Sequence, residues 1–384
     1  MGITLSSAVR QNLTSLQSTA NLLGEVQNRL ATGKKVNSAL DNPSSFFTAE
    51  GLNNRASDLS SLLDDMGQTV QTLKAADEGI KGITSLVESA KAKANQALQA
   101  SSQYERKQFA TEYNDLLGQI EDLAKDSGYN GKNLLGGTGN DLTVIFNESN
   151  TSKLSISAVN YTDTTSTTGL NLADLAAGSA ATGTITLTAG TATTALTTGD
   201  TLVSDGEFAD GDVLTFTDGN GNELGTLTVD TSTTVQDLIS KLDGFAGVSA
   251  SLSTTDLSIT SDVDLSISSS SASFNSGSDL DIDATDSGFA TDSAINNTIS
   301  SLNTTLGALR SQASTFGTNL SVVENRQSFT SSLINTLEEG AGKLTLADTN
   351  LEGANLLALQ TRQTLASTAL SFSAQADQNV LRLF

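Results

Sequence analysis

The chain has 384 residues, a formal net charge of −23 at pH 7, and no His, Cys or Trp. Without His and Cys, the sequence cannot supply a Ser-His or Cys-His nucleophile pair or the usual zinc ligand sets. The acidic balance argues against a nucleic-acid binder, which normally carries a basic face.

A carboxylate-based hydrolase remains chemically open, because two acidic side chains suffice for that reaction. An aromatic fraction of 4% leaves little to line the pocket it would need. We therefore expect no enzyme, no cofactor and no metal site. No run approaches 18 consecutive apolar residues, and Met1–Leu5 lacks a basic stretch before an apolar run, so neither a membrane span nor a Sec signal is expected.

From the N-terminus to about Gly137, apolar residues follow a helical period. They first recur every three or four residues, at Val9, Leu13, Leu16, Ala20, Leu23, Val26 and Leu30. Gly33 interrupts the period, and Asn42 before Pro43 predicts the start of a second helix, reaching about Ala100. This helix has the 3-4 alternation of a coiled coil, with core positions at Leu59, Leu63, Val70, Leu73, Ile80, Ile83 and Val87. A shorter helix is predicted over Phe109–Leu123.

Residues 141–294 are rich in Thr, Ser, Gly and Asp and alternate like strands at 183–188, 213–217 and 225–229. The Asp218–Asn222 turn predicts a hairpin between the last two, and a helix is predicted at Thr234–Leu242. From Asp141 to Asn296 there are 22 acidic and two basic residues, whereas the ends hold 21 acidic and 18 basic residues. We expect a β-rich, acidic, solvent-facing insert, with a disordered insert as the alternative.

The last segment mirrors the first. A heptad run extends to Leu344, with core positions at Ile295, Ile299, Leu302, Leu306, Leu309, Phe316 and Leu320. A helical period then returns at Leu365, Ala369, Phe372, Ala376 and Leu383, and the chain ends on Phe384. Two stripes of roughly 50 residues, on the order of 75 Å, are expected to bury each other as an antiparallel pair. The predicted fold class is α+β, a rod of long coiled-coil-like helices from both termini with an inserted β-rich outer region.

Three separated segments resemble bacterial flagellin. Leu30–Pro43, followed by Leu52–Arg55, resembles the family signature Leu-x-[Ser/Thr]-Gly-x-[Lys/Arg]-[Val/Ile]-Asn-Ser-x-x-Asp and the Asn-Arg pair after it. Gly128–Leu135 resembles the Phe-Asn-Gly-x-x-Leu-Leu element, and Ala374–Phe384 resembles the family's C-terminus. The segments stand in family order. Around Thr234–Ser261 the middle only loosely resembles a repeat of flagellin and hook-associated inserts.

The resemblance implies a secreted structural subunit that polymerises into the extracellular flagellar filament for motility. The terminal stripes Val9–Leu30 and Leu365–Phe384 would be unfolded in the free subunit, and residues 1–42 and 346–384 would form the filament core. Residues 43–140 and 295–345 would form the next layer, and residues 141–294 would face solvent. The implied core-assembly residues are Val9, Leu13, Leu16, Leu23, Leu30, Leu365, Phe372, Leu383 and Phe384.

Implied partners are other copies of the chain, the flagellar cap, hook-associated junction proteins, an export chaperone and the type III export apparatus. Short amphipathic helices are marginal alone, and each terminal stripe has an apolar face with no partner inside its own chain large enough to cover it. We therefore expect folding of the ends to be coupled to assembly. A hook–filament junction protein and a secreted coiled-coil adhesin are the alternatives.

Three further segments carry residues typical of a calcium or receptor site. Asp218-x-Asn220-x-Asn222 resembles the start of a calcium loop, but Glu223 and Val229 stand where an EF-hand needs Gly and Glu, so a turn is favoured. Asp279–Asp283 is favoured as a solvated acidic strand over a weak calcium site. Lys91, Ala92 and Lys93 fall where many enterobacterial flagellins carry an Arg-x-Arg-Glu-Leu element. In those flagellins the element is bound by the toll-like receptor that senses flagellin. Because Ala92 and Lys93 replace its Glu and Leu, we expect this chain to stimulate that receptor poorly.

Overall fold

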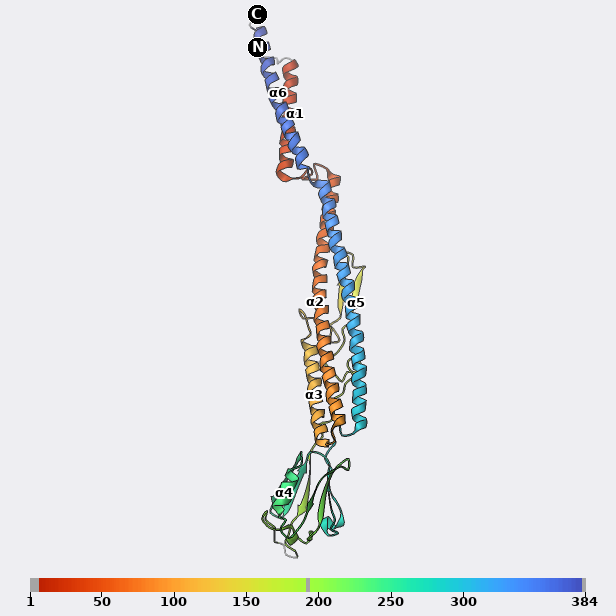
Figure 1. Cartoon of the computed structure of the whole chain (residues 1–384). Helices are drawn as coiled ribbons and strands as arrows, with labels where there is room; N and C mark the ends of the chain where they lie inside the picture. The colour runs from red at the N-terminus through yellow and green to blue at the C-terminus, as the bar shows by residue number, and fades with distance from the viewer. Residues whose placement is uncertain (1–6, 191–193, 382–384) are drawn as a thin grey trace. The chain divides into compact units, whose positions relative to one another are not determined.

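The structure, a computed structural model, describes residues 7–190 and 194–381. Its α-helices are α1 (Ser7–Thr32), α2 (Pro43–Gln99), α3 (Gln103–Asp126), α4 (Val235–Asp243), α5 (Asp292–Thr345) and α6 (Thr349–Leu381). Its strands are β1 (Leu142–Ile145), β2 (Lys153–Ile156), β3 (Ala181–Thr186), β4 (Val213–Asp218), β5 (Glu223–Thr228), β6 (Val248–Ser253), β7 (Asp256–Ser261), β8 (Leu265–Ser269) and β9 (Leu280–Ile282). Long helices from both ends and a β-rich region between them confirm the α+β prediction (Figure 1).

The second long helix begins where the sequence predicted. Pro43 is the first residue of α2, and the side-chain oxygen of Asn42 accepts a hydrogen bond from the backbone N–H of Ser45 at 3.1 Å. Asn42 thus satisfies one of the amide groups that a helix start leaves unpaired, and Pro43 has no amide hydrogen to satisfy.

The chain divides into two units, which we describe separately. The first comprises Met1–Gln68, Val144–Leu154 and Val323–Phe384, and the second comprises Thr69–Thr143 and Ser155–Val322. Helices α2 and α5 both pass from one unit to the other, so each unit holds a part of each helix.

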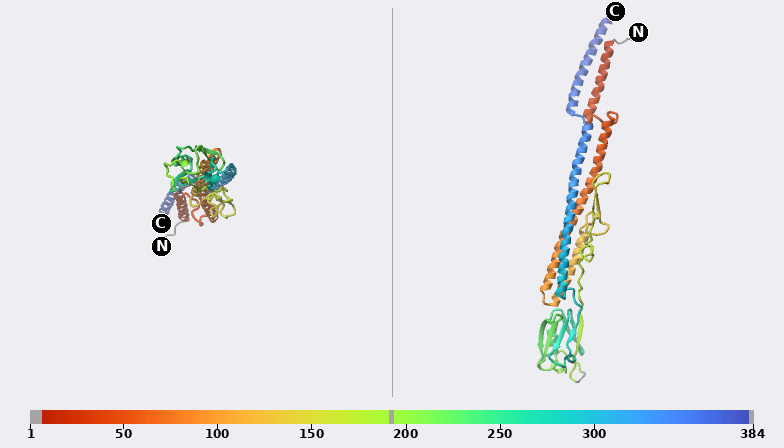
Figure 2. Two further views of the ribbon diagram at one scale, coloured as in Figure 1. Left: turned by 90° about the horizontal axis from the view of Figure 1, so that it is seen from below. Right: turned by 90° about the vertical axis from the view of Figure 1, so that its right-hand side faces the viewer.

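In the first unit, α1 lies beside α6, and the N-terminal part of α2 lies beside the C-terminal part of α5 (Figures 1 and 2). Ala56 and Leu59 of α2 form a buried cluster with Leu337 of α5. Because residues near the start of one helix contact residues near the end of the other, the two run antiparallel, as the matching stripes predicted.

The β1–β2 hairpin packs on these helices in the first unit. Nε of Arg55, on α2, lies 2.7 Å from Oε1 of Glu148, and the Arg326 guanidinium, on α5, lies 5.4 Å from the centre of the Phe146 ring. Phe146 is buried. The two arginines therefore hold the hairpin from two different helices, through an ion pair and a cation–π contact.

In the second unit, α3 lies beside the C-terminal part of α2 (Figure 1), and Nη2 of Arg106 on α3 lies 2.7 Å from Oδ1 of Asp292 at the start of α5. Buried Tyr113 of α3 makes an edge-on contact with buried Phe289, with ring centroids 5.6 Å apart. Gly79 of α2 sits against the end of α3, since a Cβ there would lie 2.8 Å from Cδ1 of Leu135 and closer still to Ser127. The close approach needs a residue without a side chain.

The β-rich part of the second unit holds two antiparallel sheets, ordered β3-β7-β6 and β5-β4-β8-β9. Helix α4 packs on β6. Thr234 and Asp237 form a capping box at its start, each side chain pairing with the other's backbone N–H. Both sheets and α4 share one core. The predicted hairpin and helix are thus confirmed, and the disordered alternative is wrong.

The two larger sheets occupy residues 181–282, and β1 and β2 form a separate two-stranded sheet within 142–156. Residues 157–176 pack along helices instead. Asn114 Nδ2 of α3 donates to the Leu175 carbonyl at 2.8 Å, and Thr305 Oγ1 of α5 donates to the Leu170 carbonyl at 2.9 Å. Leu170 and Leu172 are buried there. This segment has too few alternating positions to pair as a strand, and its leucines cover helix faces.

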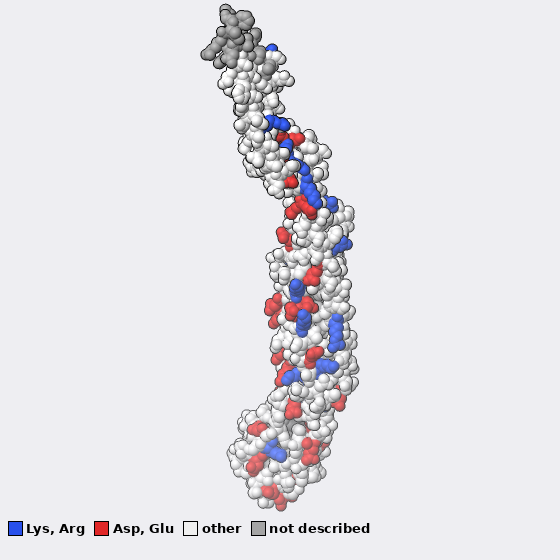
Figure 3. Space-filling view, turned by 45° about the horizontal axis from the view of Figure 1, so that its top comes forward, with Lys and Arg blue, Asp and Glu red and all other residues white. Residues whose placement is uncertain are grey.

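Charge is unevenly distributed over the molecule. Over the β-rich part, acidic side chains predominate on the face drawn in Figure 3, in keeping with the 22 acidic and two basic residues of 141–296. Among the described residues, none of the helices combines the length and the apolar character that crossing a membrane requires.

Candidate assembly site

One side of α1 lies in a seam with α6. Val9 is buried in it, and Leu16, Leu23 and Leu30, each seven residues further on, are half-buried. A spacing of seven keeps one face of a helix toward its neighbour. Helix α6 is therefore a partner for this stripe inside the chain, but it leaves Leu16, Leu23 and Leu30 only half-buried. Of the residues predicted for the filament core, Val9 and these three line the seam.

The α6 side of the seam was missed by the sequence analysis. Its half-buried apolar residues stand at heptad spacing, at Leu356, Leu359, Ala366 and Leu370. The period was present in the sequence, but a second apolar series, containing Leu365 and Phe372, runs along the same helix. The choice between two such faces depends on the partner helix, which periodicity does not identify.

Three of the other predicted core residues point outward. Leu13 is 39% exposed, Leu365 is 66% exposed and Phe372 is 67% exposed. Leu383 and Phe384 lie outside the described residues. The helix pair therefore has an inner seam and an outer apolar face, and the predicted assembly residues are divided between them.

The outer face belongs to a larger pattern. Within residues 7–190 and 194–381, the exposed large hydrophobic side chains all lie in the N-terminal 47 residues or from Val322 onward. They are Leu13, Leu22, Leu40, Phe47, Val322, Phe329, Leu346, Leu351, Leu357, Leu365 and Phe372. Apolar side chains that are exposed next to one another form the kind of surface that another molecule covers.

The predicted heptad positions of the long helices lie mostly inside. Leu63, Ile299 and Leu320 are half-buried. The buried ones are Leu59, Val70, Leu73, Ile80, Ile83, Val87, Leu302, Leu306, Leu309 and Phe316. These positions support the helix packing within each unit and leave no continuous apolar stripe of their own for a second molecule.

The loop between α1 and α2 is organised by one carboxylate. Oδ2 of Asp41 accepts hydrogen bonds from the backbone N–H groups of Asn37 and Ser38, each at 2.9 Å. Those two bonds lower the pKa of Asp41 below its ordinary value. The Asn-Ser-x-x-Asp spacing is therefore the spacing of a closed turn, with Leu40 left 95% exposed at its tip.

The Gly128–Leu135 segment closes the end of α3. Asn130 and Gly131 take positive φ angles in a turn in which Tyr129 and Lys132 exchange backbone hydrogen bonds. The Asn133 side chain donates to the Ala124 carbonyl at 2.8 Å, at the end of the helix. Asparagine and glycine are the residues that adopt such angles at least cost.

Lys91, Ala92 and Lys93 lie on α2 in the second unit. Nζ of Lys91 donates to Oδ1 of Asn303 at 2.7 Å, and Nζ of Lys93 lies 2.6 Å from Oε2 of Glu112. Ala92 is exposed. Both lysines thus make contacts to neighbouring helices within the chain, and the residue between them presents only a methyl group.

The acidic candidates do not form a metal site. Asp218 accepts hydrogen bonds from the backbone N–H groups of Asn220 and Asn222 and closes the β4–β5 turn, as the favoured reading predicted. Asp281 lies in edge strand β9, where it accepts a hydrogen bond from Ser266. In the described part of the chain, no group of three or more acidic side chains is arranged to hold a metal ion.

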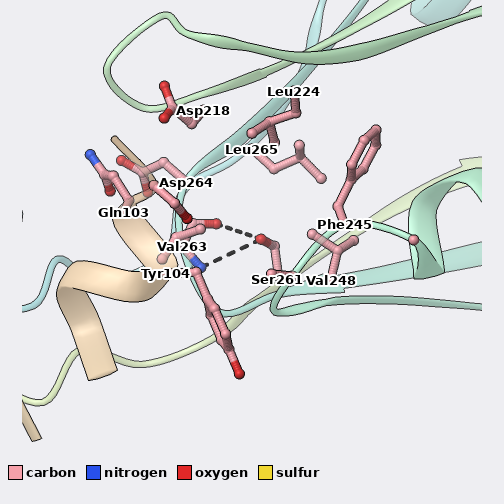
Figure 4. Close-up of a pocket in the computed structure, with 13 residues that line it drawn as sticks. Gln103, Tyr104, Asp218, Leu224, Phe245, Val248, Ser261, Val263, Asp264 and Leu265 are labelled. Atoms are coloured by element: carbon pink, nitrogen blue, oxygen red, sulfur yellow. Dashed lines mark hydrogen bonds between the residues drawn. The ribbon is translucent and has the colours of Figure 1, made fainter. Parts of the chain in front are cut away.

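A small pocket lies between the start of α3 and the β-rich part (Figure 4). Gln103 and Tyr104 contribute from α3, and Asp218, Asp264 and Ser261 from the strands and turns. Oδ1 of Asp264 is buried there without a hydrogen-bond partner in the described residues. Burial is the main cause that raises the pKa of Asp264, and the negative charges of nearby acidic residues raise it further.

The chain is similar to bacterial flagellins. The profile of the bacterial flagellin N-terminal helical region matches residues 4–140. Flagellin C of Rhizobium meliloti is 35% identical over 94 residues, and a flagellin of Brucella melitensis is 36% identical over 103 residues. These matches cover 24% and 26% of this chain, and span only 29% and 36% of the two relatives' own length.

Flagellin A of Rhizobium meliloti is 28% identical over 390 aligned positions, covering 97% of this chain and 96% of the relative. The crystal structure of Xanthomonas campestris FlgL is 12% identical, covers 75% of this chain and 97% of its own, and has a TM-score of 0.32. A similarity at that level assigns neither fold nor function. The chain is thus similar to bacterial flagellins over its N-terminal helical region, and to Flagellin A along nearly its whole length.

Proposed function

We propose that this chain is the structural subunit of a flagellar filament and polymerises through its terminal helices. One observation carries the proposal, namely that the large hydrophobic side chains left exposed in the described residues are confined to the two ends of the chain. A single copy covers the α1–α6 seam but not the outer face, so further copies are needed to remove that face from water.

The charge distribution supports the same role. The ends are close to charge balance, which lets subunits pack closely, whereas residues 141–296 hold 22 acidic and two basic residues. Like charge on neighbouring copies keeps those parts apart and in solvent. Contacts between different surfaces on successive copies give an open filament when they do not close into a ring.

The family relationship extends the proposal to location and partners. The subunit would work outside the cell as part of the flagellum, in a structural and not a catalytic role. Its partners would be other copies, the flagellar cap, hook-associated junction proteins, an export chaperone and the type III export apparatus. Within the subunit, we propose residues 1–42 and 346–384 as the core, 43–140 and 295–345 as the next layer, and 141–294 as the outer part.

Seeded elongation tests the proposal. Short sheared filaments of the protein are mixed with full-length monomer or with a fragment covering residues 52–344, and the products are examined by negative-stain electron microscopy. We expect only the full chain to extend the seeds. A full chain that stays monomeric with folded ends contradicts the filament role and favours a junction protein or an adhesin. Extension by the fragment contradicts the role of the terminal helices.

We also propose that the chain stimulates the flagellin-sensing toll-like receptor poorly. The motif region carries Ala92 and Lys93 where the resembling element has Glu and Leu, and Lys91 and Lys93 are engaged within the chain. Purified monomer is expected to give a weak response in receptor-expressing reporter cells, and Ala92→Glu with Lys93→Leu to increase it. Full activation by the unaltered chain would refute the proposal.

A further inference from the structure

A buried carboxylate lies in the terminal helix pair. The side chain of Glu352, in the first turn of α6, is only 8% exposed, and its Oε1 is 3.2 Å from Nη1 of Arg29 on α1. Its second oxygen, Oε2, is buried and has no hydrogen-bond partner in the described residues. A buried carboxylate oxygen without a partner costs free energy, so such a group normally has one in the functional state.

Glu352 lines a groove between α1 and α6, which we call the Glu352 groove. Its walls include Leu22 and Arg29 of α1 and Leu359 and Arg362 of α6, and its volume is about 530 Å³. Since a liquid water occupies roughly 30 Å³, the groove is large enough for a long side chain. Apolar side chains from both helices line it, among them Val26 and Leu359, together with charged side chains that include Glu352 itself.

Two arginines on the same helices are without an ion pair in the described residues, Arg10 on α1 and Arg362 on α6, and both are exposed. Neither can reach Glu352 of its own copy. Arg362 stands ten residues along the same helix, a rise of about 15 Å, and Arg10 lies near the opposite end of the pair, about 28 Å from Arg29. A second copy displaced along the helix axis can bring one of these guanidinium groups to the groove.

The surface around the groove favours a second copy as the occupant. Leu22 lies in its wall and is 44% exposed. Leu357, Leu365 and Phe372 continue the apolar surface along α6, and each is about two-thirds exposed. An arginine on an apolar stem matches such walls, because its methylene groups pack on leucine while its guanidinium bonds the carboxylate.

We propose that the Glu352 groove receives an arginine side chain, from the terminal helices of a second copy, that donates a hydrogen bond to Oε2 of Glu352. The contact sets the axial register between copies, since a charged pair in a groove fixes position where leucine contacts allow sliding. The inference rests on the proposed filament function and assigns one specific contact within it.

Seeded elongation of full-length variants tests this contact. Glu352→Gln keeps the shape of the side chain but removes its charge, and it is expected to slow elongation at least tenfold. Glu25→Gln is the matched control, because Glu25 lines the same groove and pairs with the same arginine but is 53% exposed. It is expected to elongate within about twofold of the unaltered chain, as exposed pairs contribute little.

Arg29→Gln separates the contact between copies from the ion pair within one copy. If Glu352 serves only to hold Arg29, both variants slow elongation equally and lower the helix content of the monomer equally. We expect instead that Glu352→Gln is the slower of the two at equal monomer helix content, measured by circular dichroism. Equal effects, or elongation of Glu352→Gln at the unaltered rate, overturn the inference.

Arginine variants identify the donor. If Arg362 supplies it, Arg362→Gln slows elongation, and adding Glu352→Gln causes no further loss. The same pair of measurements on Arg10→Gln tests the other source, and additive losses for both arginines contradict the proposal. If the unaltered chain itself fails to elongate, the proposed filament function is contradicted. If the unaltered chain elongates and the variants elongate at the same rate, only the proposed contact at Glu352 is contradicted.

Discussion

Two carboxylates of the second unit have opposite environments. Asp237 accepts hydrogen bonds from the backbone N–H and hydroxyl of Thr234, and these lower its pKa. It contributes stability above its ordinary pKa of 3.8, and that contribution is lost as the pH falls through the lower value in the folded chain. For Asp264 the effect of the charge on stability is the opposite, because burial raises its pKa and the folded chain favours the protonated form.

Asp264→Asn is therefore expected to stabilise the β-rich part at neutral pH, by about 1 kcal/mol, because it removes a charged and partly buried oxygen that has no partner. The gain should appear as a higher Tm at pH 7. It should shrink as the pH falls through the raised pKa of Asp264 and vanish below 3.8, where the carboxyl is protonated in both states.

Asp262→Asn is the control for this prediction. Asp262 is two residues away and lies 3.3 Å from Nζ of Lys107, so its charge already has a partner. Neutralising it should give no increase in Tm at any pH. A lower Tm for Asp264→Asn at pH 7 would show that its charge stabilises the fold.

Some residue roles could be predicted from sequence and others could not. Asn42 before Pro43 is a local signal, and the helix starts there because capping needs only neighbouring residues. Glu352 gave no signal, since one Glu in a helix is ordinary and its burial depends on Arg29, which is far away in the chain. Asp264 was missed for the same reason.

At the scale of elements, helix spacing depends on glycine at a few positions. Gly79→Ala is expected to destabilise the second unit, since its Cβ would overlap Ser127 and Leu135 at the end of α3. Overpacking of this kind costs about 1–3 kcal/mol. The measurement is urea unfolding followed by circular dichroism.

Gly51→Ala, in the same helix, is the matched control. No atom lies within 4 Å of its added Cβ, so the change should raise stability by roughly the 1 kcal/mol by which alanine exceeds glycine in helix propensity. If both variants gained stability, the close approach of α2 to the end of α3 would be disproved.

The long helices were predictable because one period runs through each of them for many turns. The sequence did not show which apolar face of α6 packs against α1, because Leu365 and Phe372 form one apolar series and Leu356, Leu359 and Leu370 form another. Sheet order was also beyond the sequence. Strand β4 pairs with β8 across an intervening helix and three strands, and alternation marks a strand without identifying its neighbour.

At the scale of the whole molecule, charge and exposed apolar surface occupy different parts of the chain. Most of the net negative charge lies in 141–296, which holds 22 acidic and two basic residues, whereas the exposed large hydrophobic residues of the described chain lie at its ends. Both properties act between copies. The negative charge keeps the 141–296 segments of neighbouring copies apart, and the exposed apolar surface brings their terminal helices together.

Replacing the two most outward-facing predicted assembly residues tests this account most directly. The Leu365→Ser/Phe372→Ser chain is compared with a Gln360→Ser/Gln375→Ser control on the same helix, in seeded elongation followed by light scattering and electron microscopy. Both residues are about two-thirds exposed in the single chain, so monomer helix content should not change.

Each lost apolar contact removes about 1.5–3 kcal/mol if the side chain becomes fully buried between copies. We therefore predict that the apolar double variant fails to extend seeds under conditions in which the control extends them normally. Elongation of the Leu365→Ser/Phe372→Ser chain at the control rate would contradict the claim that the outer face of the terminal helices joins the subunits.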